Sequence, residues 1–320
     1  MHHKPIIIVP GQSNSIFFEI FFKTLKKNKF FSALILICDA NIFKINAKKY
    51  NFNIAVDLIK PDQQIHLLKK KTINIINVKI KKNKKKIAKL QHDNKYIFDC
   101  FKMAFNILKK KSTYKFLNGP INKKKFLNKK YLGITEYLAK NFNKKDIGML
   151  IYNKELSVCP LTTHLPIKLV SKKITKTLII DRLIMINDFF MKNFKLKPKI
   201  AVTGLNPHCE SILNYNEDDK IVLPAINLAK KKGIFASGPY AADTVFLKQN
   251  RKKYNIVLGM YHDQVLTPLK TLFEYDAINV TMGLPFLRVS PDHGPNEKMV
   301  NKNLSNPTSL AQALKFLDKI

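Results

Sequence analysis

Short β-branched runs alternate with helix-like segments along the whole 320-residue chain, and this alternation most restricts the fold. Such alternation is typical of an α/β protein. The apolar runs predict strands at residues 6–10, 33–38, 73–78, 115–118, 148–152, 157–162, 200–203, 256–260 and 278–282. Helical periodicity predicts helices at residues 15–27, 96–110, 173–194, 217–232, 241–248 and 307–317.

The composition fits a folded protein with a sizeable core. Hydrophobic residues make up 46% of the chain, enough for one large domain or two ordinary ones. The longest apolar run, residues 30–38, is too short to span a bilayer, and the N-terminus lacks the features of a signal peptide. The four cysteines are scattered without a Cys-x-x-Cys pair, which is typical of reduced thiols. We therefore expect a cytoplasmic protein that does not bind membranes.

The formal net charge of +35 suggests a nucleic-acid-binding protein, but the type of basic residue argues against it. Only three of the 57 basic residues are arginine, the side chain that makes bidentate contacts with phosphates and bases. Lysine, asparagine and isoleucine have AT-rich codons, so a biased genome accounts for their abundance. We expect solvated lysines and no specific nucleic-acid partner.

Three of the eight histidines end hydrophobic stretches inside short polar signatures. His164 lies in Thr-Thr-His-Leu-Pro, His208 in Gly-Leu-Asn-Pro-His and His262 in Tyr-His-Asp-Gln. A single histidine of this kind is more often a hydrogen-bonded structural residue, whereas three in similar positions favour a metal site. Their spacing of about fifty residues excludes a zinc finger and fits a catalytic site with three protein ligands and an open position. Imidazole suits zinc, cobalt and nickel.

Other side chains that can carry chemistry lie outside the histidine signatures. Lys270, Asn279 and Arg288 are spaced as in strand and loop segments that line one cleft. In a chain this poor in arginine, Arg288 suggests carboxylate or phosphate binding, with a structural ion pair as the alternative. Asp243 is either a helix-capping acid or a cleft acid, and Thr135 lies where a helix N-terminus can hold an anion. Neither a Gly-x-Gly-x-x-Gly fingerprint nor a Walker A loop occurs, so a bound nucleotide needs another route.

Six short segments occur in the order typical of one enzyme family. They are Gly119-Pro-Ile-Asn-Lys, Thr162-Thr-His-Leu-Pro, Gly204-Leu-Asn-Pro-His, Ala242-Asp-Thr, Tyr261-His-Asp-Gln and Gly283-Leu-Pro-Phe-Leu-Arg. Through this ordered set the chain resembles the 4-hydroxythreonine-4-phosphate dehydrogenase family of vitamin B6 (pyridoxine) biosynthesis. The similarity is clear from Gly119 to the C-terminus and faint in the first third.

The resemblance implies a fold like that of isocitrate and isopropylmalate dehydrogenases, with two α/β/α subdomains and an active-site cleft between them. Residues 1–125 and 270–320 would form a first subdomain on the cofactor side. Residues 126–269 would form a second subdomain on the metal and dimer side. This fold binds NAD without a Rossmann glycine loop, and the family forms homodimers with an active site shared between subunits.

The resemblance also implies the reaction. Family members oxidise the secondary alcohol of 4-phosphohydroxy-L-threonine with NAD or NADP. Loss of carbon dioxide then gives 3-amino-2-oxopropyl phosphate. By this resemblance His164, His208 and His262 bind a divalent metal such as Zn, Mg or Co, and the histidine that matches His262 comes from the other subunit.

Further positions match the family's substrate, catalytic and cofactor residues. The substrate-binding residues would be Thr135, Lys270, Asn279 and Arg288. Lys270 and Asp243 would transfer protons, since burial near a metal can pull the pKa of a lysine towards neutral pH. The cofactor would lie near the segment Asp292-His293-Gly294.

The chain departs from the family on the phosphate and cofactor sides. Ile134 stands where the family has a histidine that contacts the substrate phosphate, and the residues after His208 and Gly294 lack the usual glycines. Three alternatives therefore remain. They are the family reaction, a related oxidation of another hydroxy acid with or without a phosphate, and a non-catalytic role as a metal-binding or interaction protein. A basic nucleic-acid-binding protein is a fourth.

Overall fold

The computed structural model describes residues 3–63, 68, 72–80, 86–110, 113, 115–122, 131, 133–211 and 215–320. The chain divides into two compact units, which are described separately below. Unit 1 contains Met1–Asn143 and Leu284–Ile320, and unit 2 contains Lys144–Gly283. The chain thus changes unit after residues 143 and 283, compared with the expected changes after residues 125 and 269.

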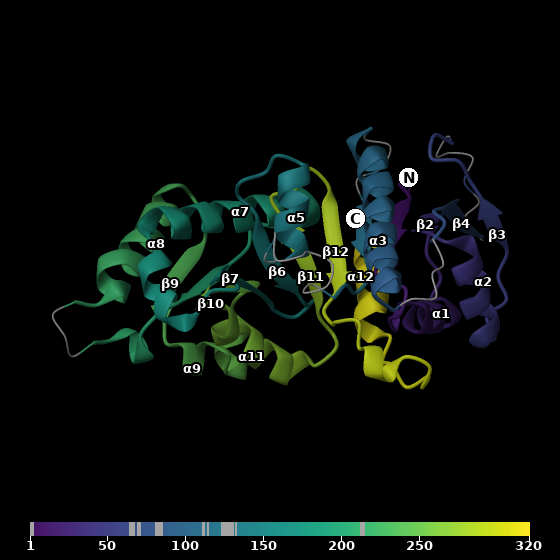
Figure 1. The fold of residues 1–320 in the computed structure, drawn as a ribbon. Helices are drawn as coiled ribbons and strands as arrows, with labels where there is room; N and C mark the ends of the chain where they lie inside the picture. The colour runs from purple at the N-terminus through teal and green to yellow at the C-terminus, as the bar shows by residue number, and fades with distance from the viewer. Residues whose placement is uncertain are drawn as a thin grey trace. The chain divides into compact units, whose positions relative to one another are not determined.

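Unit 1 is built on a parallel sheet. Its strands are β1 (Ile6–Val9), β2 (Leu34–Cys38), β3 (Val56–Leu58), β4 (Ile73–Asn77), β5 (Lys115–Asn118) and β12 (Leu287–Pro291). They lie in the order β3-β4-β2-β1-β5-β12 (Figure 1). Its helices are α1 (Phe17–Lys27), α2 (Ala40–Lys49), α3 (Lys86–Lys109), α5 (Ile134–Asn141) and α12 (Thr308–Lys319), with a 3-10 turn, η5, at Glu297–Met299.

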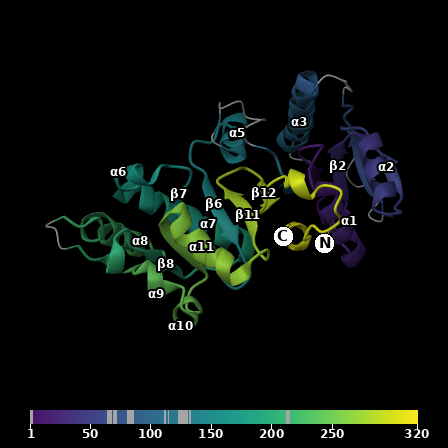
Figure 2. The same ribbon diagram turned by 60° about the horizontal axis from the view of Figure 1, so that its bottom comes forward.

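Helices cover both faces of the unit 1 sheet, so its central strands are apolar along their whole length. Helix α3 packs against β1 and β2, and its Phe101 lies in a buried cluster with Ile7 and Phe116 of the strands. Helix α12 packs against β5, β12 and α1. Figure 2 shows α3 and α1 on opposite sides of β2.

The strand order of unit 1 changes direction at β1. The chain first places β2, β3 and β4 on one side of β1 and later places β5 and β12 on the other side. In open α/β sheets, ligands bind beyond the carboxyl ends of the strands at such a switch point. The loops after β1 and β5 are therefore the expected ligand-binding edge of unit 1.

Unit 2 combines parallel and antiparallel strands. They are β6 (Gly148–Tyr152), β7 (Ser157–Thr162), β8 (Ile200–Thr203), β9 (Ala236–Tyr240), β10 (Ile256–Tyr261) and β11 (Ile278–Met282), in the order β11-β6-β7-β10-β8-β9. Strands β7, β10, β8 and β9 are parallel, and β6 runs antiparallel to β7 and β11. The helices are α6 (Val170–Lys173), α7 (Lys176–Phe194), α8 (Leu223–Lys231), α9 (Ala242–Val245), α10 (Lys248–Arg251) and α11 (His262–Phe273). Shorter turns are η2 (Ile167–Leu169), η3 (Pro207–Cys209) and η4 (Asp218–Val222).

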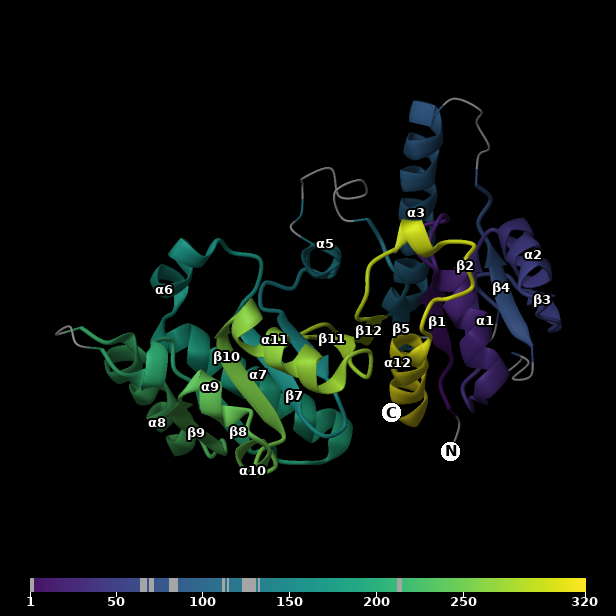
Figure 3. The ribbon, with the colours of Figure 1, turned by 90° about the horizontal axis from the view of Figure 1, so that it is seen from below.

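Two helical layers enclose the strands of unit 2. Figure 1 shows α7 and α8 above the strands and α9 and α11 below them, and Figure 3 shows α11 in front when unit 2 is seen from below. Val265 and Leu269 of α11, one turn apart, pack into a buried cluster with Val158 of β7 and Val257 of β10. This packing fixes the first turn of α11, which carries His262, against the ends of the parallel strands.

The structure confirms the α/β class that the alternating pattern predicted. Five predicted strands, at residues 115–118, 148–152, 157–162, 200–203 and 278–282, agree with the observed strands residue for residue. Elements α2, α5, α11, β3, β9 and β12 were not predicted. Within the described part of the chain, every helix is too short or too polar to cross a membrane.

Candidate functional site

Three neighbouring parallel strands of unit 2 carry the three histidine signatures at one edge of the sheet. Strands β7, β10 and β8 are adjacent and point the same way. His164 lies two residues beyond the end of β7, His262 directly follows β10, and His208 lies five residues beyond β8. The carboxyl ends of parallel strands are where α/β folds place their ligands.

His164 and His262 lie side by side. The strand register pairs Thr162 of β7 with Tyr261 of β10, and the two imidazole centroids are 6.1 Å apart. Nδ1 of His262 is 2.6 Å from Oδ1 of Asp263. In the tautomer in which Nδ1 donates to this carboxylate, Nε2 is available as a metal ligand.

His208 stands on a loop of unusual backbone conformation. Its φ angle is +56°, in the left-handed region, and the φ angle of Cys209 is +62°. The imidazole is 71% exposed, and its Nδ1 is 3.8 Å from Oδ2 of Asp243. Among the described residues, no three His, Cys, Asp or Glu side chains are grouped closely enough to hold a metal ion. Of the three predicted ligands, His164 thus lies beside His262, and His208 lies beside Asp243.

A buried carboxylate that was not singled out in the sequence holds the His208 loop. Asp218 is fully buried and accepts hydrogen bonds from the backbone nitrogens of Leu205, at 2.6 Å, and Asn206, at 2.9 Å. A Cβ atom on Gly204 would lie 3.0 Å from Oδ1 of Asp218. The glycine of the Gly-Leu-Asn-Pro-His signature therefore makes room for this carboxylate.

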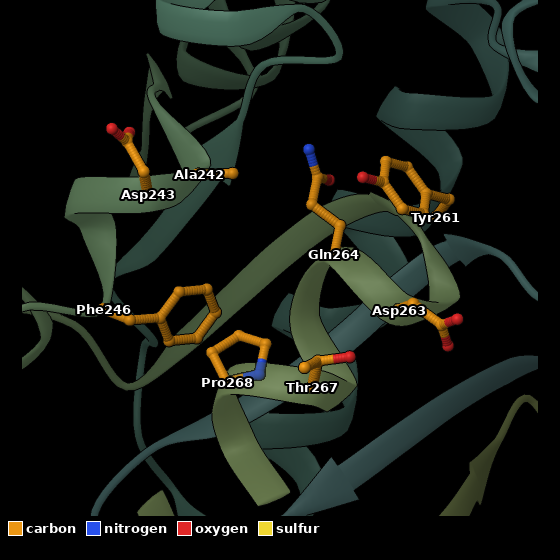
Figure 4. Close-up of a pocket in the computed structure, with 8 residues that line it drawn as sticks. All are labelled: Ala242, Asp243, Phe246, Tyr261, Asp263, Gln264, Thr267 and Pro268. Carbon is orange, nitrogen blue, oxygen red and sulfur yellow. The ribbon is translucent and has the colours of Figure 1, made fainter. Parts of the chain in front are cut away.

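A pocket of about 440 Å³ opens beside these residues in unit 2. Its lining comes from α9 and the residue after it, the end of β10 and the first two turns of α11, and consists of Ala242, Asp243, Phe246, Tyr261, Asp263, Gln264, Thr267 and Pro268 (Figure 4). Figure 4 shows Phe246 and Pro268 at one part of the pocket and Gln264 and Tyr261 at another. The pocket therefore has an apolar part and a polar part, as small-molecule sites usually do.

Lys270 and Asn279 belong to the same unit but not to the pocket lining. Lys270 lies on α11 eight residues after His262, which corresponds to about 12 Å along the helix axis. Both side chains are half-buried. Oδ1 of Asn279 is buried and has no hydrogen-bond partner among the described residues, so it is available to a polar ligand.

Arg288 and Thr135 lie in unit 1. Arg288 is 4% exposed, and its Nε donates to Oδ1 of Asn118 at 2.8 Å. Burial lowers the pKa of the Arg288 guanidinium to about 10, and the negative charge of Glu136 opposes the shift. Arg288 therefore stays charged at neutral pH. Thr135, on the first turn of α5, is half-buried beside Glu136.

Ile134 is explained by packing. It is 6% exposed and belongs to the apolar cluster of unit 1 with Tyr137 and Leu138 of its own helix and Phe286. An isoleucine at this point extends the core to the first residue of α5. It cannot donate a hydrogen bond, so any anion at this helix N-terminus would be held by backbone N–H groups and Thr135.

The predicted cofactor segment follows β12. The backbone nitrogen of Asp292 donates to Oγ of Ser309 at 2.9 Å, and Nδ1 of His293 is 3.0 Å from the carbonyl oxygen of Gly294. A Cβ atom added to Gly294 would meet nothing within 4 Å. The segment is thus anchored at Asp292 and open at Gly294.

Polar side chains that the sequence did not reveal connect the loops after β1, β5 and β12. Nε2 of Gln12 donates to Oε1 of Glu297 at 3.0 Å, and the backbone nitrogen of Asn122 donates to Oε1 of Gln12 at 3.2 Å. Gly11 and Gly119 allow these loops to meet, because a Cβ on either would lie within 2.4 Å of a backbone oxygen of the other loop. The strand-order reversal at β1 is the signal that marks this edge.

Comparison with known proteins supports the motifs. The family model for the pyridoxal phosphate biosynthetic protein PdxA matches residues 31–317. The chain is 42% identical to a 4-hydroxythreonine-4-phosphate dehydrogenase of Sulfurihydrogenibium sp. over 188 residues, which are 58% of each chain. In that comparison the chain spans less than two thirds of its relative's length.

Two further proteins match almost from end to end. A D-threonate 4-phosphate dehydrogenase of Salmonella typhimurium is 30% identical over 324 residues, covering 99% of this chain and 98% of the relative. The crystal structure of a 4-hydroxythreonine-4-phosphate dehydrogenase from Klebsiella pneumoniae superimposes with a TM-score of 0.82 at 26% identity, covering 98% of this chain and 97% of that one. The chain therefore belongs to the PdxA family of pyridoxal phosphate biosynthetic proteins.

Proposed function

We propose that the protein catalyses the NAD-dependent, metal-dependent oxidative decarboxylation of 4-phosphohydroxy-L-threonine to 3-amino-2-oxopropyl phosphate, a step in pyridoxal phosphate biosynthesis. The observation that carries this proposal is the position of His164, His208 and His262 at one edge of β7-β10-β8. The relatives' names support a phosphorylated small-molecule substrate and a nicotinamide cofactor.

The donor set suits a divalent metal ion. Imidazole nitrogens of His164, His208 and His262 suit zinc or cobalt. Asp263 supports this assignment because it fixes the tautomer of His262. A bound divalent cation would lower the pKa of the substrate hydroxyl and stabilise negative charge on the neighbouring oxygen.

We assign the remaining steps to side chains of this chain. Arg288, oriented by Asn118, would bind the substrate carboxylate or phosphate through its planar guanidinium. Asn279 and Thr135 would complete substrate binding. Lys270 Nζ would accept the proton of the substrate hydroxyl and would return it through Asp243 to the carbon that loses carbon dioxide.

We place the nicotinamide cofactor at the carboxyl edge of the unit 1 sheet, near Asp292, His293 and Gly294. The open space at Gly294 supports this location. The carboxylate of Glu297 in the same loop favours NAD over NADP, because a negative side chain repels the 2′-phosphate of NADP. We further propose a homodimer whose two active sites each take His262 from the partner.

A second candidate reaction is the oxidation of D-threonate 4-phosphate. The relative with that name matches 99% of this chain, whereas the more identical relative matches 58%. This substrate carries a hydroxyl in place of the amino group. The metal, the hydride acceptor and the anion-binding residues would serve both reactions equally.

A substrate panel tests the proposal. NADH formation at 340 nm would be measured with 4-phosphohydroxy-L-threonine, D-threonate 4-phosphate and unphosphorylated 4-hydroxythreonine, each with added zinc, cobalt or magnesium. The proposal expects the highest kcat/KM with 4-phosphohydroxy-L-threonine. A preference for D-threonate 4-phosphate would transfer the assignment to the second reaction, and no NADH with any substrate would contradict both.

A further inference from the structure

We infer that the side-chain amide of Gln264 is a positioning residue that fixes the His208 loop relative to β10 and to the end of β7, which leads to His164, and thereby sets the metal affinity. The inference rests on the proposed metal site. It concerns a residue that belongs to none of the ligand or substrate assignments above. Three hydrogen bonds of this amide carry the argument.

The amide of Gln264 joins the ends of two neighbouring strands. Its Oε1 accepts from the backbone nitrogen of Met260, at 2.7 Å, and from Oγ1 of Thr203, at 2.8 Å. Its Nε2 donates to the carbonyl oxygen of Gly204 at 2.7 Å. Met260 lies on β10, Thr203 ends β8, and Gly204 begins the loop to His208. One side chain therefore bonds to the segments that carry two of the three histidines.

The contacts continue from Gly204 to His208. The carboxylate of Asp218 binds the backbone nitrogens of Leu205 and Asn206. Gln264 thus holds the carbonyl oxygen of Gly204, and Asp218 holds the two backbone nitrogens that follow it. This constraint ends two residues before His208, where the backbone enters the left-handed region.

The end of β7, which leads to His164, is also linked to Gln264, and the link passes through Met260. Oγ1 of Thr162, which is buried at the end of β7, donates to the carbonyl oxygen of Met260 at 2.8 Å. The carbonyl oxygen of Met260 therefore accepts from the end of β7, and the backbone nitrogen of Met260 donates to Gln264. Figure 4 shows the Gln264 amide projecting from the first turn of α11 between Ala242 and Tyr261.

Gly259 of β10 allows the first turn of α11 to lie this close to the strand. A Cβ on Gly259 would lie 3.2 Å from Oε1 of Gln264 and 2.3 Å from Cγ1 of Val265. Both neighbours belong to the first turn of α11, so a side chain at Gly259 would push that turn, with His262, away from β10. The glycine and the amide together define the distance between α11 and the strand ends.

Only an amide supplies this combination of bonds. A glutamate in place of Gln264 keeps the acceptor for Met260 and Thr203 but has no donor for Gly204, and its charge repels the carbonyl oxygen. Leaving a buried carbonyl unpaired costs about 1–3 kcal/mol, which a shift of the loop would relieve. Residues that orient metal ligands typically change metal affinity by about 10–100-fold when replaced.

The test is titration of cobalt(II) into metal-free protein, followed by the visible absorption of the bound ion. Gln264→Glu is compared with wild type and with Gln249→Glu, which places the same charge on the exposed helix α10. We expect Gln264→Glu to weaken cobalt binding by about 10-fold or more and to change the absorption spectrum. We expect Gln249→Glu to match the wild type in both.

Thr203→Val provides an independent variant if Gln264→Glu does not fold. It removes one donor to Oε1 of Gln264 and should weaken cobalt binding by a few-fold with the same direction of spectral change. A wild-type affinity and spectrum in either variant, once folded, would overturn the inference alone. If the wild type gave no cobalt spectrum, or if His208→Ala gave the same spectrum as the wild type, the proposed metal site would be overturned and this inference with it.

Discussion

The imidazole rings of His164 and His262 lie with their centroids 6.1 Å apart at the ends of neighbouring parallel strands. Strand pairing brings these two residues together, because the register sets Thr162 opposite Tyr261. His208, in contrast, stands on a loop with left-handed backbone that side chains hold in place. The sheet itself therefore determines the distance between these two imidazole rings.

Mixing two inactive variants would show whether the site is shared between subunits. If His262 acts across a dimer interface, a dimer of His164→Ala and His262→Ala keeps one complete set of histidines. Random mixing should then restore about a quarter of the wild-type rate of NADH formation. His164→Ala mixed with His208→Ala is the matched control and should restore none. No recovery in the first mixture would place all three histidines in one subunit.

Replacing Arg288 by lysine should impair substrate binding. Lysine keeps the charge but loses the planar fork and the Nε bond to Asn118. Hydrogen bonds to charged groups contribute about 1.5–3 kcal/mol, so kcat/KM should fall by about 10–100-fold, mainly through KM. Arg251→Lys is the control, since Arg251 bonds only a backbone carbonyl of unit 2, and it should retain wild-type kinetics. Equal kinetics for both variants would exclude Arg288 from the site.

Lys115 should destabilise the folded protein at neutral pH, and this effect should disappear at alkaline pH. Its side chain is buried, and burial lowers its pKa below the ordinary value of 10.5, although the nearby charge of Asp318 opposes the shift. Protonation therefore favours the unfolded chain. The free-energy cost of burying the protonated lysine is fully present below the folded-state pKa and disappears as pH rises from that pKa to 10.5.

Lys115→Met should remove this pH dependence. We expect the variant to be more stable than the wild type at pH 7, with a gain that shrinks as the pH rises towards 10.5. Urea unfolding across this range measures the difference. Lys110→Met, at an exposed position directly after α3, should give no comparable gain. A destabilised Lys115→Met at pH 7 would show that the lysine's hydrogen bond to Ser32 outweighs its burial.

Two glycines should respond differently to alanine. A Cβ on Gly204 would lie 2.6 Å from Sγ of Cys209 and 3.0 Å from Asp218, so Gly204→Ala should lower the free energy of unfolding by about 1–3 kcal/mol. Gly294→Ala meets no atom within 4 Å and should leave stability unchanged. Thermal unfolding of the two variants compares them directly. If Gly204→Ala were as stable as the wild type, the His208 loop would be able to shift freely.

The sequence predicted the family and the α/β class, and both are confirmed. Strands were predictable where short runs are rich in β-branched residues, as in residues 200–203. Helix α11 was missed because Pro268 lies in its interior, and a proline without an N–H usually ends a helix. Strand β9 was missed because it contains Gly238-Pro239. Its place at the edge of the sheet explains why the structure tolerates them there.

The histidine signatures were recognisable, but the side chains that hold them were not. Gln264 and Asp218 act through bonds to backbone atoms of other segments, and no spacing in the chain reports such contacts. The same applies to Gln12 and Glu297, which are 285 residues apart. Ile134 differed from the family pattern in the sequence, and only its burial in the unit 1 core gives the reason.

The most direct test of the central claim is the metal dependence of NADH formation from 4-phosphohydroxy-L-threonine. The protein would be stripped with a chelator and then titrated with zinc or cobalt, in parallel with His208→Ala. The account predicts no NADH without metal, full recovery of the wild type at stoichiometric metal, and no recovery of the variant. Undiminished turnover by the stripped wild type, or by His208→Ala, would contradict it.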